Sequence, residues 1–285
     1  MHTVLRSTTV EVKIKTDGPF IMIGEKINPT GRKKLAEALQ QRNFDYVREL
    51  ATKQVEFGAD VLDVNVGVPG IDDVGLIPDV IKVITETVKV PLCIDSPNPK
   101  VLEAALKTAP GKVLVNSTNG EEKTLGAVLP IVKEYGAAVI GLTMDDNGIP
   151  ADPQARLKIA AKIIERAAQL GIPIEDVVID PLVMTVGAES QAGAITLKTI
   201  ELVRQEFGVN INLGASNVSF GLPDRHTLNQ AFLALAMGAG ATCAITDPIK
   251  LGATIRATDL IRGRDHYAKA YIKYCRAHPV EPTSC

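Results

Sequence analysis

Tryptophan is absent from this sequence, and aromatic residues make up only 4% of it. A core must therefore be built from Val, Ile, Leu and Ala, which is the composition typical of a parallel sheet covered by helices. The 46% hydrophobic and 22% charged residues are ordinary for a folded globular chain. The length of 285 residues leaves room for one large domain or two small ones.

Cysteines and histidines at metal-ligand spacing are also missing. The four histidines form no H-x-x-x-H or H-E-x-x-H pair, and the four cysteines show no C-x-x-C spacing. We therefore expect no metal site in this chain. Two of the cysteines fall inside apparent strands, where they are expected to act as small buried hydrophobes. The cysteines are Cys93, Cys243, Cys275 and Cys285.

Strong charge and long apolar runs are lacking as well. A net charge of −2 and a pI near 6.1 predict no general affinity for nucleic acid or for an anionic membrane. No run approaches the 18 or so apolar residues of a membrane span. The first residues lack the apolar stretch of a secretory signal, so a cytoplasmic location is expected.

A repeating order of apolar run, polar ending and amphipathic helix is present from residue 20 onward. It predicts a single (β/α)8 TIM barrel over 20–285, preceded by a short N-terminal β extension over 1–19 that contains a strand at 8–15. An open doubly wound sheet is the alternative, weakened because no G-x-G-x-x-G follows a strand. The expected strands are 20–24, 61–66, 92–95, 113–116, 138–143, 177–180, 209–213 and 243–246. The expected helices are 45–57, 77–88, 99–107, 121–135, 153–170, 195–207, 227–238 and 255–273.

Asp and Asn residues follow most of these strands, and the stretch Asn212–Ser219 is the most polar of the endings. In a barrel, the carboxyl ends of the strands meet at one rim, where catalytic groups gather. Carboxylates and amides without histidine suit hydrogen bonding to a flat, nitrogen-rich heterocycle better than acid–base chemistry at neutral pH. The alternative for each residue is a bond to local backbone in the turn. The polar endings are Glu25, Asn28, Asp63, Asn65, Asp95, Asn98, Asn116, Asn119, Asp145, Asp180, Asn217 and Asp247.

Two basic features lie near these endings. The cluster Gly31–Lys34 is expected to be a solvated loop, with reception of an anionic substrate tail as the alternative. Arg225 lies shortly after Asn217, and for it a site role and a surface role are equally supported.

Seven motifs occur in the order found in pterin-binding methyltransferases, and the likeness covers roughly residues 20 to 274. The sequence most resembles the methyltetrahydrofolate:corrinoid protein methyltransferases, including the folate module of cobalamin-dependent methionine synthase. The motifs are Gly24–Asn28, Leu62–Gly67, Cys93–Ser96, Val115–Asn119, Ile140–Met144, Ile179–Leu182 and Ser216–Ser219.

The resemblance implies a (β/α)8 barrel, usually dimeric, that binds the pterin in its rim cavity. It implies that Asp95, Asn116 and Asp180 hold the pterin ring, with Asp63 nearby. Asn217 would reach N5, the nitrogen that bears the methyl group, and Arg225 matches a basic position of the family.

The reaction implied by the resemblance moves a methyl group between N5 of tetrahydrofolate and the cobalt of a corrinoid (cobalamin), in a direction that the residues leave open. Because one barrel accounts for the chain, the corrinoid is expected on a separate corrinoid protein. Phe220 stands where acetogenic relatives carry a polar amide, and Asp145-Asp146 stands where they carry Asn-Lys. These two departures concern the surface that faces the corrinoid partner.

Three other functions are weighed against this one. A dihydropteroate synthase shares the pterin barrel, but the sequence lacks an Asn-x-Thr-x-Asp-Ser-Phe stretch after the first strand and a Ser-Arg-Pro loop. A Schiff-base aldolase needs a lysine at a strand end, and the expected strands offer none. A non-catalytic folate-binding protein would use the same polar groups without transferring a methyl group.

Overall fold

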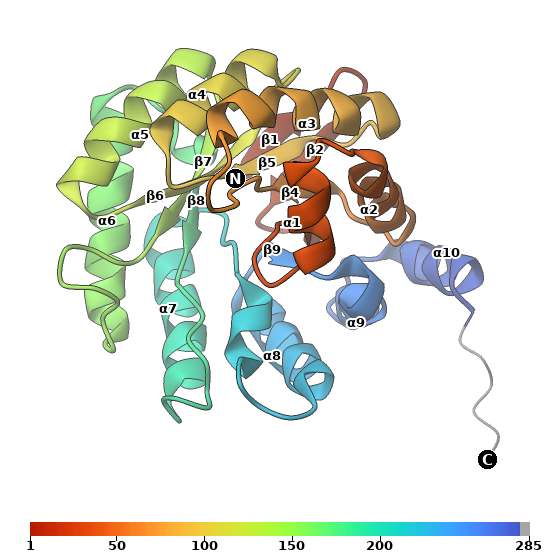
Figure 1. Cartoon of the computed structure of the whole chain (residues 1–285). Coiled ribbons are helices and arrows are strands. Elements are labelled where there is room, and N and C mark those ends of the chain that lie inside the picture. Colours follow the sequence, from red (N-terminus) through yellow and green to blue (C-terminus); the bar gives the residue numbers. More distant parts are fainter. Residues whose placement is uncertain (280–285) are drawn as a thin grey trace.

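The protein is described here from a computed structural model, which places residues 1–279. Its centre is a curled sheet of seven parallel strands in the order β8-β7-β6-β5-β4-β3-β9. Helices α3 to α9 form an arc around these strands (Figure 1). The strands are β3 (Ile21–Ile27), β4 (Val61–Val64), β5 (Leu92–Asp95), β6 (Leu114–Asn119), β7 (Ala138–Leu142), β8 (Val177–Asp180) and β9 (Cys243–Thr246).

The helices form where an apolar stripe recurs at helical spacing. In α3, for example, Leu76, Ile77, Val80 and Ile81 are all buried and lie on one face. The helices of residues 1–279 are α1 (Lys33–Gln40), α2 (Asp45–Glu56), α3 (Asp73–Thr87), α4 (Pro99–Thr108), α5 (Glu122–Tyr135), α6 (Pro153–Gln169), α7 (Ala192–Phe207), α8 (Arg225–Ala239), α9 (Pro248–Ile261) and α10 (Lys269–Ala277).

The eighth position of the expected barrel holds no regular strand. The segment 209–213 was predicted as a strand, but it carries only an isolated parallel bridge at Ile211, with a second one following at Gly214. Its backbone still bonds to both neighbours, since Asn212 N donates to the β8 residue Ile179 and the β9 residue Ile245 donates to Leu213 O. The structure therefore has the α/β architecture that was predicted, without eight regular strands.

The N-terminal residues form a hairpin, so the strand predicted at 8–15 is present but shorter, and a second strand that was not predicted pairs with it. Strands β1 (His2–Arg6) and β2 (Glu11–Lys15) pair antiparallel. Leu5 and Ile14 are fully buried in one cluster with inward side chains of the parallel sheet, among them Ile23 and Leu114. The alternation of β2 is visible in the sequence, whereas the five residues of β1 that pair with it give no comparable signal.

Two helix predictions also need correction. The expected helix 255–273 is interrupted, because Tyr267 and Ala268 adopt left-handed backbone between α9 and α10. Helix α1 was missed because its eight residues bury only Leu35 and Leu39. None of the helices within residues 1–279 is long and apolar enough to cross a membrane.

Candidate functional site

A cavity of about 380 Å³ opens at the carboxyl ends of the parallel strands. Five of the six predicted site residues line it, and they come from segments far apart in the chain. The sixth, Asp180, does not line it. The lining residues are Glu25, Asn28, Thr30, Arg32, Asp63, Asp95, Asn116, Gly214, Ser216, Asn217, Arg225 and Ile245.

Asp63 and Asn116 form one wall of the cavity. Asp63 is 2% exposed at the β4 rim, and its Oδ1 accepts a hydrogen bond of 3.2 Å from Asn116 Nδ2. Burial, followed by the nearby Asp95 carboxylate, raises the pKa of Asp63 to about 8. At neutral pH this carboxyl is therefore mostly protonated, so it can donate as well as accept.

Asp95 ends β5 between these two strands and is fixed by two amides. Its Oδ2 accepts from Asn28 Nδ2 at 3.2 Å and from Asn65 Nδ2 at 3.0 Å. Burial raises the pKa of Asp95, and the Asn65 hydrogen bond opposes that rise. With Oδ2 occupied by two donors, Oδ1 is the oxygen available to a ligand in the cavity.

Asp180 is buried beneath this rim. Its Oδ1 accepts from Leu182 N and its Oδ2 from Asn212 Nδ2, both at 2.8 Å. Burial raises the pKa of Asp180 to about 6, against the lowering effect of these hydrogen bonds. Asp180 thus joins β8 to the segment before Asn217, and this internal bonding accounts for its position outside the cavity wall.

Asn217 and Arg225 lie on the opposite wall, in and after the short 3-10 helix Ala215–Ser219. Asn217 is exposed, and its backbone carbonyl accepts from Phe220 N. Arg225 donates through Nη2 to Ser216 O at 2.7 Å and through Nε to Ser219 Oγ at 3.1 Å. The guanidinium therefore fastens the turn that carries Asn217 and keeps its charge at the cavity.

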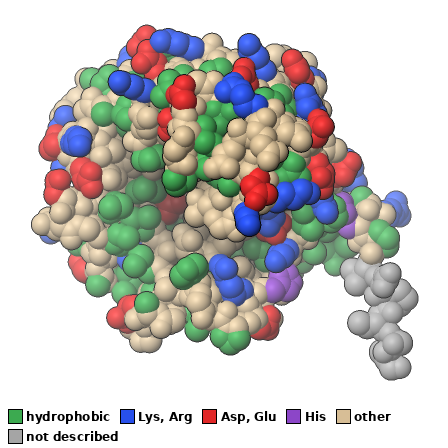
Figure 2. All heavy atoms as spheres, viewed as in Figure 1, with side chains coloured by type: hydrophobic (Ala, Val, Ile, Leu, Met, Phe, Trp, Pro, Cys, Tyr) green, Lys and Arg blue, Asp and Glu red, His purple; other side chains and the backbone are tan. Residues whose placement is uncertain are grey.

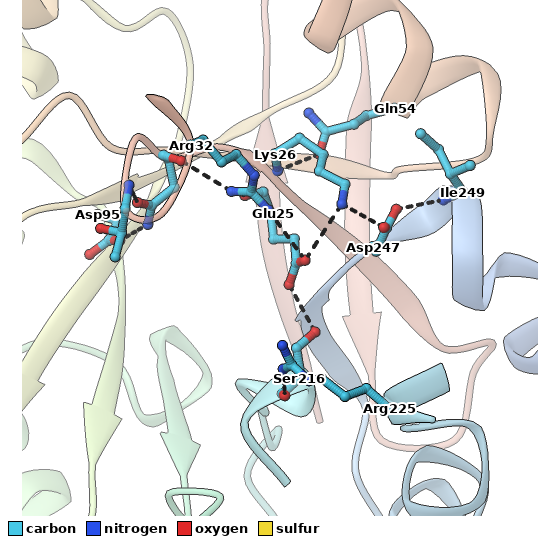
Figure 3. Close-up of polar contacts among 11 residues, drawn as sticks. Glu25, Lys26, Arg32, Gln54, Asp95, Ser216, Arg225, Asp247 and Ile249 are labelled. Atoms are coloured by element: carbon cyan, nitrogen blue, oxygen red, sulfur yellow. Dashed lines mark hydrogen bonds and ion pairs between the residues drawn. The ribbon is translucent and has the colours of Figure 1, made fainter. Parts of the chain in front are cut away.

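Seven of the twelve lining residues were not predicted as site residues, and three of these seven are linked to one another by polar contacts. Glu25 accepts a hydrogen bond of 3.0 Å from Ser216 Oγ and lies 3.6 Å from Arg32 Nη2 (Figure 3). Arg32 also donates to the backbone oxygen of Glu25, so the loop after β3 is folded back over the site. Glu25 was visible as a strand-end carboxylate, Ser216 lay in the polar stretch Asn212–Ser219, and Arg32 lay in the basic cluster Gly31–Lys34.

A lysine does stand at a strand end, contrary to the sequence prediction. Strand β3 continues to Ile27 instead of ending at residue 24, and it includes Lys26. Lys26 Nζ lies 2.5 Å from Asp247 Oδ2 and 3.9 Å from Glu25 Oε1. Figure 3 shows this ammonium held between the two carboxylates, a charged arrangement unlike the desolvated lysine that Schiff-base formation requires.

Several of the polar residues at strand ends hydrogen-bond to nearby backbone, which was the alternative to a role in the site. Asn98 caps α4 by accepting from Lys100 N, and Asn119 accepts from Glu121 N. Asp145 accepts from Asn147 N. Within residues 1–279 no cluster of three or more His, Cys, Asp or Glu side chains is arranged to hold a metal ion. Cys285 lies outside the described residues.

Comparison with known proteins places the chain in a family. The sequence profile of the pterin binding enzymes matches residues 24–247. The chain belongs to the pterin-binding enzyme family. That match begins within β3 and ends at the residue that caps α9, so it includes six of the parallel strands in full, the end of β3 and every lining residue of the cavity.

Two relatives within the pterin-binding enzymes are similar over most of this chain. A methylcorrinoid:tetrahydrofolate methyltransferase of Eubacterium limosum is 31% identical over 272 residues, which cover 92% of this chain and 98% of the relative. The methionine synthase of Mycobacterium tuberculosis is 30% identical over 248 residues, or 82% of this chain. The aligned part makes up 21% of that synthase, so the chain corresponds to one segment of the larger enzyme.

Solved structures of pterin-binding enzymes share the fold. A Yersinia pestis dihydropteroate synthase in complex with a sulfonamide drug superposes with a TM-score of 0.71 at 16% identity, covering 93% of this chain and all of the other. A Xanthomonas albilineans dihydropteroate synthase with 4-aminobenzoic acid gives 0.68 at 20% identity, covering 92% of this chain and 98% of the other. At these identities the likeness concerns the fold alone.

Proposed function

We propose that this chain is a methyltransferase that moves a methyl group between N5 of tetrahydrofolate and the cobalt of a corrinoid carried on a separate protein. The relative from Eubacterium limosum supports this reaction, because it is aligned over nearly its whole length. The folate and the corrinoid are both substrates here. The direction of transfer depends on which methylated partner is supplied.

The cavity geometry supports different roles for its two walls, one binding the pterin ring and the other meeting N5. Asp63, Asp95 and Asn116 form a wall of carboxyl and amide groups that matches the N–H and carbonyl edge of a pterin. Asp180 supports the rim from below through Asn212. Asn217, on the other wall, is then the group positioned to meet N5, with Arg225 fastening its turn.

The chemistry at N5 explains why an amide is placed there. When the methyl carbon moves from N5 to cobalt, Co(I) supplies the electron pair of the new Co–C bond, the N–C bond breaks with its electron pair going to N5, and N5 takes a proton from solvent. A tertiary amine leaves more easily if a donor stabilises the charge that develops on nitrogen. The Asn217 amide can supply that hydrogen bond in the transition state more than in the ground state.

The observation that carries the proposal is that Asn217 shares one cavity with Asp63, Asp95 and Asn116. The test is rapid mixing of the protein with methyltetrahydrofolate and free Co(I) cobalamin, with the loss of the Co(I) absorbance followed over time. Transfer faster than the protein-free rate, unaffected by chelators, supports the proposal. Absence of transfer with an intact fold and measurable folate binding would favour a non-catalytic folate-binding protein.

A dihydropteroate synthase-like activity is the second candidate, favoured only by the shared fold. It predicts condensation of a pterin pyrophosphate with 4-aminobenzoate, which can be assayed directly. We expect none, because the sequence motifs of that reaction are missing. Heat stability gives a further check, since methyltetrahydrofolate should raise the melting temperature while NAD and ATP should not.

The proposal includes a homodimer and a corrinoid protein as partner, which come from the resemblance. It also includes a cytoplasmic location, which was expected from the sequence. We also propose that the eighth barrel position is filled by the segment before Asn217, which makes the fold a variant of the (β/α)8 barrel. Light scattering of the purified protein tests the dimer, and co-purification of a cobalamin spectrum tests the partner.

A further inference from the structure

A second, smaller cavity of about 240 Å³ lies beside the first at the same rim. Glu25, Arg32, Ser216 and Arg225 line both cavities, so the two share a wall. Its volume is below the roughly 300–1,000 Å³ of sites that enclose a whole drug-sized ligand. It therefore suits a substituent of a molecule seated in the first cavity. Its other lining residues are Lys26, His226, Asn229, Asp247, Lys250 and Leu251.

The charges around the second cavity do not balance. Four cationic side chains and two carboxylates line it, an excess of two positive charges without counting His226. The carboxylates are already engaged: Asp247 with Lys26 at 2.5 Å and Glu25 with Arg32 at 3.6 Å. Figure 3 shows these pairs on the side of the cavity formed by β3 and the start of α9.

The other two cations, Arg225 and Lys250, supply the excess. Among residues 1–279, Arg225 hydrogen-bonds to a backbone oxygen and a hydroxyl and pairs with no carboxylate, so its charge is not balanced there. No carboxylate of residues 1–279 lies within 4.0 Å of Lys250 Nζ. On the face in Figure 2, Lys and Arg side chains lie to the right of the centre, with Asp and Glu side chains among them and His side chains nearby.

We propose that this second cavity binds the glutamyl carboxylates of the folate tail, and that Lys250 and Arg225 are the residues that recognise them. The inference rests on the proposed function, because it assigns the first cavity to the pterin. Tetrahydrofolate carries an aminobenzoyl group and then one or more glutamates, each adding a free carboxylate. A positively charged cavity that shares a wall with the pterin site is reached by that tail without a change in the fold.

Arg32 connects this proposal to the basic cluster at 31–34. Its guanidinium lies in the wall common to both cavities. The neighbouring Lys33 instead points to Glu37, and Lys34 lies over the Tyr46 ring at 3.8 Å. Of the three basic residues in this cluster, Arg32 therefore belongs to the wall that the two cavities share. Lys33 and Lys34 are surface charges and can serve as matched controls.

The experiment compares three ligands: 5-methyltetrahydrofolate with one glutamate, the same folate with four glutamates, and 5,6-dimethyltetrahydropterin, which has no tail. Calorimetry at low salt should show the tetraglutamate binding about two- to fivefold more tightly than the monoglutamate, as expected for a partly exposed ion pair. Lys250→Gln should remove most of that preference and leave the affinity for the tail-less pterin unchanged. Lys33→Gln, which removes one charge outside both cavities, should keep the preference.

The outcomes separate this inference from the proposed function. If all three ligands bind but the number of glutamates has no effect, the tail site is overturned while the pterin site stands. If Lys33→Gln lowers the preference as much as Lys250→Gln, the effect is general surface charge, and the site is again overturned. If none of the ligands binds, the proposed function fails together with the inference. Loss of the preference at high salt would support the ionic origin.

Discussion

The amide of Asn116 donates to the carboxyl of Asp63 at 3.2 Å, although the two residues lie 53 positions apart and their strands are not neighbours. Strand β5, which ends in Asp95, runs between them. The bond therefore bridges the rim at β5, and the buried carboxyl of Asp63 lies near the partly buried carboxyl of Asp95. That arrangement makes the site sensitive to pH.

Stability should fall as the pH rises through neutrality because of Asp63. The folded state raises its pKa from the ordinary value of 3.8 to about 8, so between these values the folded chain holds a proton that the unfolded chain releases. This contribution to stability is complete below pH 3.8 and is lost as the pH approaches 8. Its slope is at most about 1.4 kcal/mol per pH unit. Urea unfolding at several pH values should show the decline in the wild type and a flatter profile in Asp63→Asn.

Asp95→Asn should weaken folate binding while preserving the shape of the site. The change removes the negative charge that accepts N–H bonds from the pterin, and a hydrogen bond to a charged group contributes about 1.5–3 kcal/mol. Calorimetric titration with methyltetrahydrofolate measures the loss. Asp146→Asn, on the exposed loop after β7, removes the same charge away from the site and should bind normally. Equal affinities for wild type and Asp95→Asn would give Asp95 a structural role only.

Asn217→Ala should slow the transfer more than it weakens binding. Loss of one donor to a transition-state charge typically costs about 10²–10³-fold in rate. The ring remains held by the opposite wall, so KM should change less than kcat. Single-turnover loss of Co(I) at saturating folate measures the step, with the exposed Asn147→Ala as control. A rate within about threefold of wild type would mean that this amide does not assist the leaving nitrogen.

Arg156→Met should destabilise the rim from beneath. Arg156 is 2% exposed and donates to the carbonyl oxygens of Pro150, Pro181 and Leu182. Its removal leaves buried carbonyl oxygens without a donor, at a cost of about 1–3 kcal/mol each. We therefore expect the free energy of unfolding to fall by about 3 kcal/mol or more. Arg166, on the same helix, makes an exposed ion pair with Glu122, and Arg166→Met should cost less than about 1 kcal/mol. Equal losses in urea unfolding would contradict the proposed support of the rim.

Leu5→Ala tests whether residues 1–19 are an extension separate from the domain expected over 20–285. Because Leu5 is fully buried against the parallel sheet, its truncation should lower the free energy of unfolding by about 2–5 kcal/mol. Val10→Ala, in the hairpin turn, should cost less than about 0.5 kcal/mol. A single cooperative transition in both variants would show that the hairpin unfolds with the barrel. A Leu5→Ala protein as stable as wild type would support a dispensable extension.

The sequence predicted the alternation of strands and helices well, because buried strands and amphipathic helices leave local patterns. It predicted the walls of the cavity for the same reason: Asp63, Asp95 and Asn116 follow apolar runs, and parallel strands end at one rim. It missed the irregular backbone before Asn217, because an apolar run looks alike whether it forms a ladder or two isolated bridges.

The charged wall of the second cavity could not be predicted from local sequence patterns. Lys26 meets Asp247 across 221 positions, and Ser216 meets Glu25 across 191. Such pairings are set by how the sheet curls and by where long side chains reach. Arg32 is a clear example, since its two lysine neighbours carry the same charge and yet lie away from the site.

The N-terminal hairpin also has a consequence for how the chain is made. Asn210 donates to Thr3 and to the Ile14 carbonyl, and β3 pairs with β9, which begins at Cys243. Thr3 is therefore synthesised 207 positions before Asn210, and β3 is synthesised long before β9. Until β9 is made, one edge of β3 lacks its neighbour, so the nascent chain presents an open sheet edge. We expect a ribosome-bound chain that stops before residue 240 to depend on chaperones, and extension of the chain through β9 to end that dependence.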